Sequence, residues 1–159
     1  MKARNVISSL LAGFGATTVH IGLMTIKHRA GILPDFEPYD DLQRLLSSMT
    51  TLSLEPPFSW LLPFVNGALI LGFVFGKLFI HLPGRTAIIK GVTFGFVAWM
   101  VMGLGLLPLA GRGVFASNLG LGVVPAALMF AMLMIYAIVM SLLYAWLLGP
   151  PGTKSERRH

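Results

Sequence analysis

The 159-residue sequence contains no cysteine and has few charged residues. The lack of cysteine excludes disulfides, thiolate metal sites and iron–sulfur clusters. Charged residues make up 11% of the chain, whereas they are roughly a quarter of a typical soluble domain. Hydrophobic residues make up 55% of the chain. This composition is typical of a protein embedded in a membrane.

Four long stretches carry no formal charge, and each is long enough for a membrane span. They are residues 5–26, 56–76, 91–111 and 113–153. A hydrocarbon core about 30 Å thick requires about 20 apolar residues in a helix. We therefore predict an all-α, integral membrane four-helix bundle that forms a single transmembrane domain over 1–159. The expected spans are about 5–27, 58–81, 87–109 and 120–148, with a tail at 149–159.

Lysine and arginine are divided unevenly between the two expected sides of the membrane. The side with both termini and the connection between the second and third spans carries eight of these residues, and the other side carries four. The positive-inside rule then predicts cytoplasmic N- and C-termini. For the first apolar run, its length and the lack of a clear cleavage site favour a retained span over a cleaved signal peptide. The net charge of +6 is explained by these flanks and does not indicate a nucleic-acid partner.

The outer connection between the first and second spans has an amphipathic pattern. Apolar residues recur there every three or four positions, and Pro38 suits the first position of a helix. The pattern predicts a short amphipathic interfacial helix at about 38–53. Acidic residues gather in this outer loop at Asp35, Glu37, Asp40 and Asp41. We favour helix capping and a solvated face for them, with a divalent-cation site as the alternative.

His20 and Asn66 are the polar side chains that define a candidate intramembrane site. His20 is the only ionisable residue well inside an expected span, and such a residue must find a partner because its burial is costly. Asn66 lies at similar depth on the neighbouring helix. A hydrogen bond between the two would act as interhelical packing, which we favour, or would mark a polar pocket that opens outward.

No pattern in the sequence indicates a catalytic centre or a cofactor. A b-type haem needs two histidines at matching depth, and no pair of the four histidines meets this condition. The glycine pairs lack the preceding strand of a dinucleotide fingerprint. We therefore expect no cofactor, no metal and no enzymatic activity.

Small residues at a spacing of four occur in every expected span. In the second and third spans they form Gly72-x-x-x-Gly76 and Gly91-x-x-x-Gly95. Such pairs let helices approach closely, and close packing holds a bundle together in lipid. We expect these four glycines to lie at helix–helix contacts.

Several glycine- and proline-containing runs resemble those of a family of small uncharacterised bacterial four-span membrane proteins. The runs begin at Gly31 (GILPDFEP), Phe64 (FVNG), Pro108 (PLAGRG) and Leu119 (LGLGVVP). The likeness covers about 6–148 and departs from the family at Asn66, where a small or apolar residue is expected. It implies a four-helix protein of the bacterial inner (plasma) membrane. Because that family is a domain of unknown function, no catalytic residue follows from the likeness.

Abundant packing faces and the lack of catalytic motifs favour a non-enzymatic accessory or assembly subunit of a membrane complex. Besides the lipid bilayer, its partner would be another membrane protein or further copies of itself. The alternative is a small transporter or channel, which would form an oligomer or act alone, with a polar pocket at His20 and Asn66.

The uneven charge distribution gives a direct test of topology. Reporter fusions at residue 40 and at the C-terminus should report opposite sides of the membrane, with the C-terminus cytoplasmic. A C-terminal fusion active only outside the cytoplasm would contradict the predicted orientation.

Overall fold

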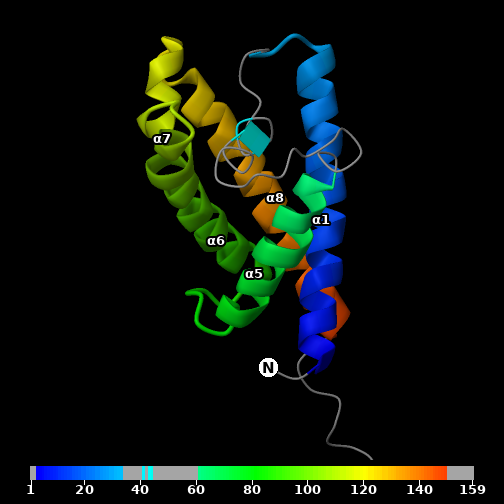
Figure 1. Ribbon diagram of the computed structural model, residues 1–159. Helices are drawn as coiled ribbons and strands as arrows, with labels where there is room; N and C mark the ends of the chain where they lie inside the picture. The colour runs from blue at the N-terminus through cyan, green and yellow to red at the C-terminus, as the bar shows by residue number, and fades with distance from the viewer. Residues whose placement is uncertain (1–2, 34–40, 42, 45–60, 150–159) are drawn as a thin grey trace, which may run out of the picture.

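The computed structural model describes residues 3–33, 41, 43–44 and 61–149, and all the elements in that part of the chain are helical (Figure 1). Helix α1 (Ala3–Arg29) runs the full height of the bundle. Its last turn contains Lys27, His28 and Arg29, whose charges are favourable beside the negative end of the helix dipole.

The second helix is continuous but changes its winding along its length. It consists of α4 (Leu62–Phe64), the π-helical segment η1 (Val65–Leu71) and α5 (Gly72–Leu78). The expected span began near residue 58, and residues 58–60 lie outside the described part of the chain.

The third helix also contains a π-helical segment. It consists of α6 (Ala87–Val101), η2 (Met102–Leu106) and α7 (Leu107–Leu109). Thr86 begins it as an N-cap, because its side-chain oxygen accepts a hydrogen bond of 3.3 Å from the Ile89 backbone nitrogen. The 3₁₀ segment η3 (Val114–Leu119) follows.

Helix α8 (Val124–Leu148) begins later than the expected position near residue 120. Gly120 and Gly122 have positive φ values of 69° and 60°. A right-handed helix does not continue through residues in this conformation. Pro125 instead occupies the first turn, where its missing N–H costs nothing. The side chain of Asn118 donates to the Gly111 carbonyl rather than capping α8.

Three helices are long and apolar enough to cross a membrane: Arg4–Arg29, Ala87–Leu109 and Val124–Leu148. Their mean hydropathies are 1.5, 1.9 and 2.4. The second helix, Leu62–Leu78, is apolar but shorter. Of the expected interfacial helix at 38–53, the structure describes Asp41, Gln43 and Arg44, which have helical backbone; the rest, like Asp35, Glu37, Asp40 and tail residues 150–159, lies outside the described residues.

Helix α8 is central to the arrangement. It packs against α6 on one side and α1 on the other, and α1 in turn packs against η1 and α5. One end of the bundle holds Arg4, Leu148 and the turn from α5 to α6, and we call it the termini end. The opposite end holds the α7–η3 turn, and we call it the Arg112 end. Which compartment each end faces stays a prediction.

Aromatic rings join three of the helices at the termini end. The Phe75 ring of α5 makes edge contacts with Phe94 of α6 and Tyr144 of α8, at centroid distances of 5.0 and 5.7 Å. Lys90 of α6 also donates to the Phe79 carbonyl across the α5–α6 turn, at 2.5 Å. The second and third helices are therefore fastened to each other at this end.

The glycine pairs of the second and third helices lie at helix–helix contacts. A Cβ atom at Gly72 would lie 2.9 Å from the Ser9 carbonyl oxygen of α1. A Cβ atom at Gly91 would lie 2.9 Å from the Ala137 carbonyl oxygen of α8. Gly76 and Gly95 are buried as well. Helix backbones thus approach one another too closely for a larger residue.

This packing predicts that Gly91→Ala destabilises the protein. The added methyl group would press on the α8 backbone, which has little freedom to move, so we expect a loss of about 1 kcal/mol or more of unfolding free energy. Unfolding in mild detergent would measure the loss.

The matched control is Gly22→Ala, on α1. No atom lies within 4 Å of the position that a Cβ would take there, so this change should be neutral or stabilise the helix by about 0.5–1 kcal/mol. Equal effects of the two substitutions would contradict the close packing of Gly91.

Candidate functional site

A cavity of about 350 Å³, partly open to the outside, lies between the second and third helices. These two helices touch at the termini end and diverge toward the Arg112 end (Figure 1). Helices α1 and α8 also contribute to the wall. Among the lining residues that the structure describes, most are aliphatic or aromatic, and the polar side chains are those of His20, Lys27, Asn66 and Tyr136.

The two π-helical segments form opposite parts of the cavity wall. Asn66 and Ile70 come from η1, and Met102 and Leu106 come from η2. Proline accounts for the change of winding in η2, because Pro108 has no N–H to donate and its ring would clash with the carbonyl four residues earlier in a regular helix. Short π-helical segments inside α-helices occur frequently at functional sites.

His20 points into the bundle and reaches α8. Its side chain is buried, and its ring makes an edge contact with the Tyr136 ring at a centroid distance of 6.0 Å. The Met132 backbone of α8 also lies beside the His20 ring. His20 and Asn66 line the same cavity. No hydrogen bond joins them in the described part of the chain, so the expected pair is replaced by contacts of His20 with α8.

Tyr136 connects α8 to the second helix. Its hydroxyl donates a hydrogen bond of 2.6 Å to the Gly67 carbonyl oxygen, which also accepts from the Gly72 backbone nitrogen. A Cβ atom at Gly67 would overlap the Thr17 hydroxyl of α1. Glycine is therefore required at position 67 for the second helix to lie this close to α1 while its carbonyl meets Tyr136.

Sequence reasoning missed Tyr136, Gly67 and Lys27 as parts of the site. Tyr136 lies in an uncharged span, and its hydroxyl was the available signal, because a buried tyrosine hydroxyl usually finds a partner. In the sequence, Lys27 was interpreted only as a residue at the end of a span. In the structure it is 4% exposed and lines the cavity.

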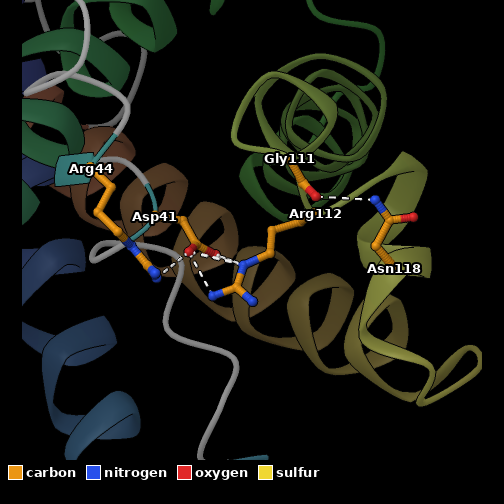
Figure 2. Close-up of polar contacts among 5 residues, drawn as sticks. All are labelled: Asp41, Arg44, Gly111, Arg112 and Asn118. Atoms are coloured by element: carbon orange, nitrogen blue, oxygen red, sulfur yellow. Dashed lines mark hydrogen bonds and ion pairs between the residues drawn. The ribbon is translucent and has the colours of Figure 1, made fainter.

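Asp41 is the member of the outer acidic group that the structure describes, and it is buried rather than solvated. Its carboxylate accepts hydrogen bonds from Arg112 Nε at 2.9 Å and Nη2 at 2.8 Å (Figure 2). Arg44 lies on its other side at 2.6 Å. This ion pair joins the connection between α1 and the second helix to the turn that follows the third helix. The expectation of a solvated face is therefore wrong for Asp41.

The ion pair predicts that Asp41→Asn is destabilising. The substitution removes the buried carboxylate charge that the half-buried Arg112 guanidinium contacts, and we expect a loss of roughly 2–4 kcal/mol of unfolding free energy. Arg44→Gln serves as the control, because the Arg44 side chain is 67% exposed and such a contact contributes about 1 kcal/mol or less. Similar losses for both variants in detergent unfolding would contradict a special role for the Asp41–Arg112 pair.

The elements in the described residues are thus helical, three of them are long and apolar enough to cross a membrane, and a cavity of ligand size lies between the second and third helices. The chain belongs to a family of unknown function, DUF6789, which matches residues 3–155. No curated protein and no solved structure matches it.

Proposed function

We propose that the protein is a non-enzymatic membrane protein that binds a small apolar or amphipathic molecule between its second and third helices. The observation that carries this proposal is the cavity of about 350 Å³. Small-molecule sites are typically about 300–1,000 Å³ in volume, with a mostly apolar lining and a few polar groups that fix the ligand's orientation. The cavity has both features.

The proposal includes four membrane spans, with Leu62–Leu78 as the second. This helix packs along α1 with one side and exposes Val65, Leu69 and Phe73 on the other. An apolar outward face is what a lipid environment requires. By the charge distribution, the termini end would face the cytoplasm of a bacterium.

A binding cavity is also the first requirement of a small transporter, the alternative suggested by His20 and Asn66. An ion channel would need a continuous polar path through the bundle. The lining favours an organic ligand over an ion, because its polar groups are few and scattered among apolar ones.

A specific feature of α1 favours the second candidate function, an accessory subunit of a membrane complex. Thr18, Gly22 and Thr25 are exposed and share one face of the helix. The threonine hydroxyls donate to carbonyl oxygens of their own helix. These side chains are small and their hydroxyls are already hydrogen-bonded within α1. Such a surface suits the close approach of a helix from another protein or from a second copy of this chain. Loss of a co-purifying protein on Gly22→Leu would support this role.

The binding proposal is tested by filling the cavity. Ala98 lines it, so Ala98→Phe should displace a bound molecule while the bundle stays folded. Ala131→Phe is the control, because Ala131 of α8 is exposed and lies outside the cavity lining.

Purification in mild detergent, followed by mass spectrometry of extracted small molecules, provides the measurement. We expect a co-purifying molecule in the wild type and in Ala131→Phe, and its loss in Ala98→Phe. A wild type without bound small molecules, or equal retention in all three proteins, would contradict the proposed function.

A further inference from the structure

We infer that the ligand is an anionic phospholipid of the surrounding bilayer, with one acyl chain in the cavity and its phosphate at the turn between α5 and α6. This inference rests on the proposed function and names the chemical class of the ligand, its route of entry and its orientation. Two observations carry it: the cavity opens along an apolar mouth, and the turn at one end of that mouth is basic.

The mouth of the cavity is identified by lining residues that are also exposed at the surface. In the second helix these are Ile70, Val74 and Leu78, which recur every four residues and therefore lie in one row. In the third helix they are Val97 and Val101, also four residues apart. None of the polar side chains in the described lining is exposed. The mouth thus has one aliphatic edge on each of the two helices.

An aliphatic mouth of this kind suits hydrocarbon rather than water. The third helix, Ala87–Leu109, is long and apolar enough to cross a membrane, and the second helix packs beside it at the termini end. Exposure of these aliphatic side chains to water costs free energy, whereas exposure to lipid tails does not. A molecule of the bilayer can therefore enter sideways between the two helices. Phospholipids are the main molecules with such access.

The turn between α5 and α6 places positive charge at one end of the mouth. Leu78 is the last residue of α5 and belongs to the mouth, and Lys77 precedes it. Arg85 lies in the turn, which joins the two helices of the mouth (Figure 1). Lys77 and Arg85 are both exposed. The Lys77 ammonium lies over the Phe73 ring at 5.0 Å, a contact that leaves its charge in place.

No carboxylate neutralises this turn within the described residues. Residues 56–155 contain no aspartate or glutamate, so neither helix of the mouth supplies one. Asp41 is the acidic residue that the structure describes, and it pairs with Arg112 at the opposite end of the bundle. A phosphate provides the negative charge and the acceptor oxygens that the turn lacks. Because a phospholipid carries its phosphate beside its acyl chains, one molecule matches both the turn and the mouth.

The first experiment compares three lipids that share palmitoyl and oleoyl chains. Phosphatidylglycerol is anionic, phosphatidylcholine is zwitterionic, and the diacylglycerol has no phosphate. Each is titrated into the purified protein in mild detergent, and native mass spectrometry measures the bound lipid. We expect phosphatidylglycerol to bind most tightly and the diacylglycerol to bind least tightly.

Charge variants test whether the turn holds the phosphate. Arg85→Gln and Lys77→Gln should each weaken phosphatidylglycerol binding about fivefold. Arg29→Gln is the matched control, because it removes one charge from an exposed residue at the other end of the bundle. All three positions are exposed, so the packed core stays unchanged. Equal losses in the three variants, or no loss in any, would overturn the inference.

Cavity variants test whether an acyl chain occupies the space between the helices. Ala98→Phe should abolish phosphatidylglycerol binding, and Ala131→Phe should retain it. Val101→Trp obstructs the exposed mouth without a change in the packed core, and it should also weaken binding. Unchanged binding in both Ala98→Phe and Val101→Trp would place the lipid at the turn alone and overturn the inference.

The outcomes distinguish the inference from the proposed function. Equal binding of the three lipids that is lost in Ala98→Phe would overturn the inference and leave the proposed binding function in place. A different co-purifying small molecule, with no binding of phosphatidylglycerol, would have the same meaning. A wild-type protein that binds none of the lipids and retains no other small molecule would overturn both.

Discussion

The hydroxyl of Tyr136 donates to the Gly67 carbonyl at 2.6 Å, and this hydrogen bond fixes where the second helix lies. It joins α8 to η1 inside the bundle, where a buried tyrosine hydroxyl needs a hydrogen-bond partner. On the other side of η1, the absence of a side chain on Gly67 admits Thr17 of α1. The His20 ring contacts Tyr136, so α1, η1 and α8 meet around a single polar cluster.

The cavity is a consequence of this position. With its first half held against α1 and α8 around Gly67, the second helix meets the third near the termini end, through Phe75 and Phe94. The third helix packs on α8 through Gly91 and Gly95, so neither helix is placed to fill the space between them. In a membrane, lipid tails are as apolar as the helices, and the hydrophobic effect does not close such a space. A bound apolar chain is therefore a natural occupant.

Much of the helical architecture could be predicted from the sequence. Long uncharged stretches and the small-residue pairs are local features, and they indicated apolar helices with close contacts at Gly72 and Gly91. The first residue of α8 was harder to predict, because it depends on the positive φ values of Gly120 and Gly122. The π-helical segments were missed as well, since the apolar pattern of a span does not show how tightly the helix is wound.

The candidate site could be predicted only in part. His20 and Asn66 were identified because polar groups are costly in a span, and both line the cavity. The partners of His20 could not be inferred, because a single sequence does not show which helices are neighbours or how they are rotated. The role of Asp41 was misjudged for the same reason, since Arg112 lies 71 positions away in the chain.

The central claim is that a mostly apolar, partly open cavity between the second and third helices binds a small molecule. An experimental structure of the wild-type protein in lipid nanodiscs tests this claim most directly. The account predicts separated η1 and η2 segments with elongated density between them, and a Tyr136 hydroxyl within hydrogen-bond distance of the Gly67 carbonyl. A structure in which η1 and η2 pack directly against each other, with no space for a ligand, would contradict it.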